Sequence, residues 1–166
     1  MFRIEFVIHR NISDQQLIDI VNVKSKQWNY EKKSQLAWIK DNIKNSDIHV
    51  LLYKQNDQIA YLNLIDIEIA LNGNKMKAYG VGNVCAVEKG KGYGLELMRN
   101  VNTYILNLAK VGILFCKKDL LNFYLKTGWI VLEQKNIDIK NNNDFVMLYG
   151  YPSKENLLIK YSDIRF

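Results

Sequence analysis

The feature that most constrains the fold of this sequence is a pair of long apolar runs joined by Asn72 and Gly73. Residues 59–71 and 75–87 are rich in β-branched and aromatic side chains, as strands usually are. Asn-Gly favours a two-residue type I′ turn, because both central residues of that turn need a positive φ. The pattern therefore predicts an antiparallel hairpin in which Glu68 faces Lys77 across the two strands.

A glycine-rich stretch, "EKGKGYG" at residues 88–94, follows the second strand of this hairpin directly. An amphipathic helix comes next, with its apolar stripe at Leu97, Met98, Val101, Tyr104, Ile105 and Leu108. The first N–H groups of a helix have no intrahelical acceptor and carry the positive end of the helix dipole. A glycine-rich turn before such a helix can therefore bind a phosphate or pyrophosphate through backbone N–H groups.

Two common phosphate-binding loops do not fit this stretch. A Walker loop needs Ser or Thr after its Gly-Lys pair, but Lys91 is followed by Gly92. A dinucleotide-binding loop needs G-x-G-x-x-G early in a βαβ unit, whereas "GKGYG" follows an antiparallel hairpin.

The remaining elements are short and alternate in type. Strands are expected at residues 2–9, 47–54, 111–116, 129–135 and 145–151, and helices at 13–30, 31–44 and 118–128, with Asp119 as N-cap and Gly128 as C′ residue of the last helix. Residues 136–144 read as a polar connection, and residues 152–166 as a helical turn or an edge strand. The order β-α-α-β-β-β-α-β-α-β-β predicts an α/β (α+β) protein, one domain over residues 1–166, with helices on both faces of a single sheet.

Composition narrows the class of protein further. The net charge of +6 is spread over scattered lysines, which favours a lysine-rich surface over a dedicated nucleic-acid-binding face. The thiols of Cys85 and Cys116 lie in apolar runs, and the histidines His9 and His49 are far apart in sequence, so we expect neither disulfides nor a metal site. No signal peptide or transmembrane segment is recognisable, which predicts a cytoplasmic protein without membrane contact.

Two motifs resemble the GNAT superfamily of N-acetyltransferases. The stretch "KGKGYG" at residues 89–94 is similar to the family's coenzyme A pyrophosphate loop, and "FYLKTGW" at residues 123–129 is similar to its F-Y-x-x-x-G-[FW] pattern. The element order is also that of the family. Two departures are Lys89, where the family more often has Arg or Gln, and the lack of a proline before the loop. The resemblance implies the GNAT fold, a mixed and mostly antiparallel sheet of six to seven strands.

The resemblance also implies an activity and a set of site residues. The chain would transfer an acetyl group from acetyl-CoA to a primary amine within a ternary complex, without a metal. Tyr124 would be the general acid that protonates the leaving thiolate. The pantetheine arm and the pyrophosphate would bind Gly82, Asn83, Val84, Lys89, Gly90, Lys91, Gly92, Tyr93, Gly94 and Leu95. Lys89 and Lys91 would be rim charges, while backbone N–H groups form the cradle.

The general base and the acceptor stay open at the sequence level. A carboxylate could deprotonate the amine, and the candidates are Asp66, Glu68, Asp119, Glu133 and Asp144. By resemblance, the acceptor would bind near residues 22–35 and 136–145, and small-molecule and protein amines both fit. Two alternatives are a catalytically silent CoA-binding module and an acetyltransferase acting on aminoacyl-tRNA. The chain is expected as a monomer or homodimer.

Overall fold

The computed structural model describes residues 1–140, 142–152, 157–162 and 166. These residues form two compact units. Unit 1 comprises Met1–Ile65 and Gly82–Asn100, and unit 2 comprises Asp66–Val81 and Val101–Phe166. The single domain expected over residues 1–166 stays a prediction.

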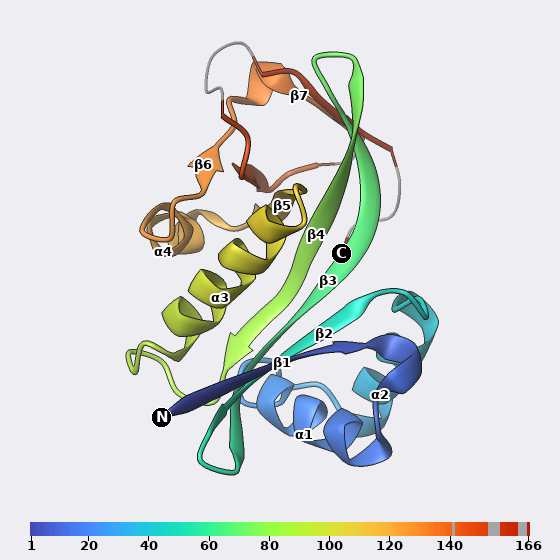
Figure 1. Ribbon diagram of the computed structural model, residues 1–166, viewed down its shortest axis with the longest axis vertical. Coiled ribbons are helices and arrows are strands. Elements are labelled where there is room, and N and C mark those ends of the chain that lie inside the picture. Colours follow the sequence, from blue (N-terminus) through green and yellow to red (C-terminus); the bar gives the residue numbers. More distant parts are fainter. Residues whose placement is uncertain (141, 153–156, 163–165) are drawn as a thin grey trace. The chain divides into compact units, whose positions relative to one another are not determined.

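The order of elements along the chain is the predicted one, with two short strands added (Figure 1). The helices are α1 (Asp14–Lys24), α2 (Lys32–Asn42), α3 (Tyr93–Asn107) and α4 (Leu121–Leu125), with single 3-10 turns at His9–Asn11, Lys118–Leu120 and Gln134–Asn136. The strands are β1 (Phe2–Ile8), β2 (Ile48–Lys54), β3 (Asp57–Leu71), β4 (Asn74–Ala86), β5 (Val111–Cys116), β6 (Ile130–Val131), β7 (Ile137–Ile139), β8 (Phe145–Tyr149) and β9 (Ile159–Tyr161).

The strands form one mixed, mostly antiparallel sheet, as predicted. Its order is β1-β2-β3-β4-β5-β8-β6, and β9 pairs with both β3 and β7. Only β4–β5 and β7–β9 are parallel among the pairs whose register is resolved in the described residues. The sheet has nine strands rather than six or seven, because the three-residue strands β7 and β9 lie in stretches whose patterns were too short and too polar to be read as strands.

The hairpin at Asn72 and Gly73 is confirmed. Strand β3 ends at Leu71 and β4 begins at Asn74, and the two turn residues have φ values of 49° and 79°. Glu68 forms the expected ion pair with Lys77, at 3.7 Å, and a closer one with Lys75, at 3.2 Å. These side chains are largely exposed, so the pairs contribute little to stability, and the turn geometry sets the register.

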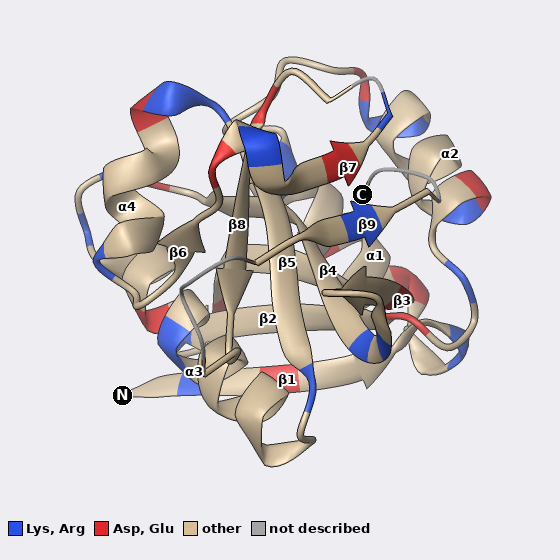
Figure 2. Ribbon diagram, turned by 90° about the horizontal axis from the view of Figure 1, so that it is seen from above, with Lys and Arg blue, Asp and Glu red and all other residues tan. Residues whose placement is uncertain are grey.

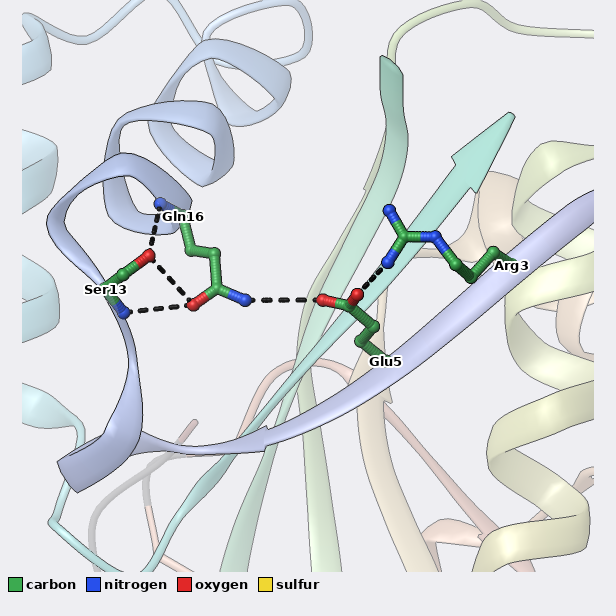
Figure 3. Close-up of polar contacts among 4 residues, drawn as sticks. All are labelled: Arg3, Glu5, Ser13 and Gln16. Carbon is green, nitrogen blue, oxygen red and sulfur yellow. Dashed lines mark hydrogen bonds and ion pairs between the residues drawn. The ribbon is translucent and has the colours of Figure 1, made fainter. Parts of the chain in front are cut away.

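In unit 1, a chain of polar side chains ties α1 to β1 (Figure 3). Ser13 is the N-cap of α1 and forms a capping box with Gln16. The same Gln16 donates from Nε2 to Glu5 Oε2 on β1, at 3.3 Å, and Glu5 also pairs with Arg3. A single amide therefore closes the helix end and fixes α1 against the strand.

Unit 2 is organised around the buried side chain of Trp129. Asn102 on α3 accepts a hydrogen bond from Trp129 Nε1, at 2.9 Å, and donates to the carbonyl of Thr127, at 2.7 Å. An added Cβ at Gly112 on β5 would lie 2.6 Å from the Trp129 ring, so only glycine fits there. The "FYLKTGW" motif is therefore a packing unit in its own right.

Two details of the α4 region correct the sequence-based expectations. Asp119 is not the cap of α4, because it lies inside the 3-10 turn Lys118–Leu120 and α4 begins at Leu121. Gly128 has the expected positive φ, 86°, but it lies one position beyond C′, since Lys126 is the C-cap. Of the final stretch, Ile159–Tyr161 is a strand but not an edge strand, because it pairs with both β3 and β7. Residues 153–156 and 163–165 lie outside the described part.

Candidate functional site

The glycine-rich stretch forms a loop that leads directly into α3, and both the loop and the first half of α3 belong to unit 1. Gly90 and Gly92 have φ values of 78° and 76°, in the left-handed region that glycine adopts without steric cost. The first helical bond of α3 runs from Glu96 N to Gly92 O, at 3.0 Å. The N–H groups of Tyr93, Gly94 and Leu95 precede that bond, so helix geometry gives them no intrahelical acceptor. Backbone donors thus gather where the sequence predicted an anion cradle.

Two hydrogen bonds hold the start of this loop in place. Val87 N donates to Ile59 O on β3, at 2.9 Å, and Gln27 Nε2 donates to Ala86 O at the end of β4, at 2.8 Å. The ring of Tyr93 packs edge-on against Phe2, with ring centroids 6.1 Å apart. Tyr93 can therefore offer its backbone N–H to a ligand, while its side chain anchors the helix start.

The lysines of the loop lie at its surface. Lys89 and Lys91 are both exposed, and Lys91 Nζ lies 3.9 Å from Glu88 Oε2. Their exposure fits the expectation that the two lysines place charge at the rim of the loop, while backbone N–H groups bind the phosphates. Figure 2 shows basic and acidic residues interspersed along the ribbon, in keeping with the scattered charge of the sequence.

The three residues expected beside the pantetheine arm lie near the end of β4. Gly82 is buried, and Asn83 and Val84 are half-buried. Asn83 has a φ of 54°, an irregular conformation for a non-glycine strand residue, and its Nδ2 donates to Asn63 Oδ1 on β3, at 2.6 Å. The backbone at Gly82–Val84 therefore departs from regular strand geometry.

Tyr124 lies on α4 in unit 2 and is 6% exposed. Its ring contacts Phe123 and Trp129 edge-on, with centroids 4.9 and 6.4 Å apart. The motif residues Phe123, Tyr124 and Trp129 are thus brought together. Because Tyr124 and the loop belong to different units, its role as general acid stays a proposal.

The five candidate carboxylates also belong to unit 2, and four of them have lysine partners. Asp66 pairs with Lys110 at 2.9 Å, Glu133 with Lys135 at 2.7 Å, and Asp144 with Lys117 at 2.5 Å, while Glu68 pairs across the hairpin. Asp119 is exposed in its 3-10 turn. Ion pairing accounts for most of these carboxylates, and none is singled out as a base.

A polar row lies in unit 1, formed by the half-buried His9 and the buried His49 and Tyr61. His9 Nδ1 lies 2.8 Å from His49 Nε2, and His49 Nδ1 lies 2.8 Å from Tyr61 Oη. A neutral His49 has one N–H donor and one acceptor nitrogen, so the two hydrogen bonds run in the same direction. Either Tyr61 donates to His49 and His49 donates to His9, or His9 donates to His49 and His49 donates to Tyr61. Two histidines that are distant in sequence are thus adjacent in the fold.

Burial controls the protonation of this row. It lowers the pKa of His49 to about 3, with His9 and Lys24 adding repulsion. It raises the pKa of Tyr61 well above its ordinary value, and that of Cys85 to about 12. His49, Tyr61 and Cys85 are therefore neutral near pH 7.

This protonation pattern predicts a pH-dependent stability. The unfolded chain binds a proton at His49 below about pH 6.5, whereas the folded protein resists it until about pH 3. Unfolding therefore becomes easier as the pH falls, by about 1.4 kcal/mol between pH 7.5 and 5.5. Urea unfolding of the wild type and of His49→Gln at both pH values measures this: the variant should lose that part of the pH dependence. An identical pH dependence in both proteins would contradict the neutral His49.

Sequence reasoning missed several buried polar residues of unit 1, among them Lys24, His49, Tyr61 and Asn63. Each sits in a run that was read as an ordinary helix or strand. The sequence did contain a signal for Asn63. It lies in a strand whose neighbouring residues are apolar and buried, and asparagine is uncommon at such a position. A buried asparagine at such a position needs a hydrogen-bond partner.

In the described part of the chain, no helix is both long and apolar enough to cross a membrane. Within the same residues, no cluster of three or more His, Cys, Asp or Glu side chains has a geometry suited to a metal ion.

The sheet order, the glycine loop between β4 and α3, and the helix placement together define the fold of the GNAT N-acetyltransferases. The structure is similar to that of ElaA from Escherichia coli, with a TM-score of 0.62 and 18% identity over 90% of this chain and 100% of that one. It is similar to an acyl-CoA N-acyltransferase from Pseudomonas aeruginosa, with a TM-score of 0.65 and 14% identity over 90% and 100% of the two chains. It is also similar to the PaiA N-acetyltransferase from Thermoplasma acidophilum in complex with coenzyme A, with a TM-score of 0.60 and 15% identity over 90% and 99%.

No protein-family model matches the sequence, and no curated protein matches it. The similarity is therefore one of fold, at sequence identities that leave the activity to be argued from the site.

Proposed function

We propose that this protein is an N-acyltransferase that moves an acetyl group from acetyl-CoA to a primary amine. The observation that carries the proposal is the loop between β4 and α3. Two left-handed glycines and three N–H groups at the start of a helix support an anion cradle of backbone donors, in a fold shared with a CoA-bound N-acetyltransferase. The pyrophosphate of CoA is a ligand of matching charge for such a cradle.

A direct transfer from acetyl-CoA to the amine fits the two cysteines better than a covalent acyl-enzyme. Both thiols are buried, and burial raises the pKa of Cys85 to about 12 and that of Cys116 to about 11. A thiol of this kind is almost entirely protonated near pH 7 and is a poor nucleophile. In the proposed mechanism the amine nitrogen attacks the thioester carbon, the C–S bond breaks, and the CoA thiolate takes up a proton from Tyr124.

The backbone near Val84 is proposed to stabilise the oxyanion of the tetrahedral intermediate. The irregular strand geometry at Asn83 supports this role, since it turns backbone groups out of the regular ladder. We also propose that the transferred group is acetyl rather than a longer acyl chain. The same proposal includes a cytoplasmic location and a monomer or homodimer.

Calorimetry with CoA and with pantetheine, which lacks the pyrophosphate, tests the loop. We expect CoA to bind at least about a hundredfold more tightly, because only CoA can use the backbone cradle. Equal affinity for the two ligands would remove the loop as a pyrophosphate site.

A second measurement tests catalysis: release of the CoA thiol from acetyl-CoA in the presence of a panel of primary amines. Acceleration by at least one amine is expected. Binding of CoA without acceleration by any amine would favour the catalytically silent CoA-binding module, and activity restricted to aminoacyl-tRNA would favour the RNA-directed enzyme.

A further inference from the structure

Lys24, in the last turn of α1, is a buried lysine. It is 5% exposed, and its Nζ lies 4.7 Å from the centroid of the Trp38 ring on α2. Among the described residues, no carboxylate forms an ion pair with it. Burial lowers the pKa of Lys24, and the Cys85 thiol opposes that shift only in part. A cation–π contact offsets some of the lost hydration of an ammonium group, but it does not supply a counter-charge.

Asn63, on β3, has a buried donor without an acceptor. The side chain is fully buried, and its Oδ1 accepts from Asn83 Nδ2. Within the part of the chain that the structure describes, Asn63 Nδ2 has no hydrogen-bond partner. A flip of the Asn63 amide alone would place its NH₂ group against that of Asn83. The bond to Asn83 therefore fixes the orientation of the Asn63 amide, and its NH₂ group points away from Asn83. An unpaired buried donor is costly, which marks it as a site that a ligand oxygen or a water can complete.

These two groups both belong to unit 1. Asn63 lies directly opposite His49 in the β2–β3 register, and the charge of Lys24 acts on both His49 and Cys85. Cys85 follows Asn83 by two residues along β4. Asn63 bonds to Asn83, and Gln27, three residues after Lys24, donates to Ala86 O. Both groups are therefore neighbours of the β4 segment around Gly82–Val84, the backbone segment that we propose for the thioester.

Lys24 Nζ and Asn63 Nδ2 are both hydrogen-bond donors. Lys24 offers an ammonium group and Asn63 an N–H, and both lack an anionic partner among the described residues. A carboxylate has only acceptor atoms and would supply the missing charge. A diamine or polyamine would instead bring a second cation toward Lys24.

We propose that the acceptor is a small amino acid, whose carboxylate accepts hydrogen bonds from Lys24 Nζ and Asn63 Nδ2. This inference rests on the proposed acyltransferase function and names its substrate class. The reaction balances as an ammonium group plus acetyl-CoA giving an amide, CoA thiol and one released proton. The nitrogen forms the new bond to the acyl carbon, and the sulfur leaves with the electron pair of the C–S bond.

Matched acceptors test the class of substrate. Glycine, β-alanine and γ-aminobutyrate are each compared with the corresponding carboxamide and with the alkylamine that lacks the carboxylate. We expect kcat/KM for the best amino acid to exceed that of its alkylamine by at least about thirtyfold. Equal or faster turnover of the carboxamide or the alkylamine would overturn the proposal.

Two variants test the residues. Lys24→Met keeps the length of the side chain but removes its charge, and we expect it to lose most of the preference for the carboxylate while CoA affinity is unchanged. Asn63→Asp keeps an acceptor for Asn83 but replaces the free donor with an anion, so binding of amino acids should fall at least about thirtyfold.

Lys26→Met is the matched control, because Lys26 is an exposed lysine two residues from Lys24, and this variant should behave as the wild type. Unchanged acceptor preference in a folded Lys24→Met would show that Lys24 has only a structural role.

Direct calorimetry separates this proposal from the proposed function. Amino acids and the matching alkylamines are titrated into the CoA-saturated protein. We expect the amino acids to bind more tightly than their alkylamines, since only the amino acids offer a carboxylate to Lys24 and Asn63. Binding with no turnover would contradict the transferase but support the carboxylate site. CoA binding with no amino acid binding would overturn the site and leave the transferase standing. If CoA itself does not bind, the titration into the apoprotein decides the carboxylate site in the same way.

Discussion

Gly92→Val is expected to weaken CoA binding strongly while the protein still folds. Gly92 has a φ of 76°, a conformation that costs a residue with a side chain about 1–2 kcal/mol, more for a β-branched one. The free loop of the variant relieves this strain by leaving the left-handed conformation, and recovering that conformation on binding CoA costs about a five- to thirtyfold loss of affinity. No atom lies within 4 Å of an added Cβ, so the new side chain meets the ligand space rather than the protein core. The dissociation constant for CoA, measured by calorimetry, should therefore rise by two orders of magnitude or more.

Gly73→Val provides a matched control for this variant. Gly73 has a φ of 79° and equally open surroundings, but it lies in the β3–β4 turn, away from the loop in sequence. We expect it to lower the free energy of unfolding by about 1–2 kcal/mol and to leave CoA affinity unchanged. Wild-type affinity in a folded Gly92→Val would remove the loop from the site. Lys89→Ala and Lys91→Ala should weaken CoA only modestly, because both side chains are exposed.

Tyr124→Phe is expected to lower kcat by about 10²- to 10⁴-fold without changing CoA affinity. The substitution removes only the hydroxyl that is proposed to protonate the leaving thiolate, and general acid catalysis typically contributes that much. The ring contacts with Phe123 and Trp129 do not involve the hydroxyl, so packing should be kept. The measurement is the pH dependence of kcat, with the dissociation constant for CoA determined in parallel.

Tyr149→Phe controls for the aromatic surroundings of Tyr124. Its ring stacks on Trp129 with centroids 5.5 Å apart, so it removes a hydroxyl from the same aromatic group. We expect wild-type kcat from this variant. Equal turnover by the wild type and Tyr124→Phe at every pH would show that Tyr124 only packs.

The sequence predicts the β3–β4 hairpin and the start of α3 well because both depend on local chemistry. Asn72 and Gly73 tolerate positive φ, and Gly90 and Gly92 do so before an amphipathic helix, so each signal lies within a few residues. The cap at Asp119 failed because a 3-10 turn competes with the helix start at the same residues.

The buried polar residues could not be predicted in the same way, because their partners are distant in sequence. His9 and His49 are 40 residues apart, and Asn83 reaches Asn63 across 20 residues. Lys24 reads as an ordinary lysine of the helix expected at residues 13–30, and only the fold reveals that its ammonium group lies over the Trp38 ring of α2. The strands β7 and β9 were not predicted, because three residues are too few to show a periodic pattern.

The hydrogen bonds of Gln16 to Ser13 and Glu5 restrict which residue can occupy position 16. In an isolated peptide, glutamate would serve as well as glutamine at the third position of a capping box and would suit the helix dipole better. In this protein the glutamine must also donate to Glu5, and a glutamate there would place two carboxylates together. The substitution that a helix-propensity scale favours is therefore the one that the tertiary structure rejects, so sequence variation at position 16 should be read from the strand rather than from the helix.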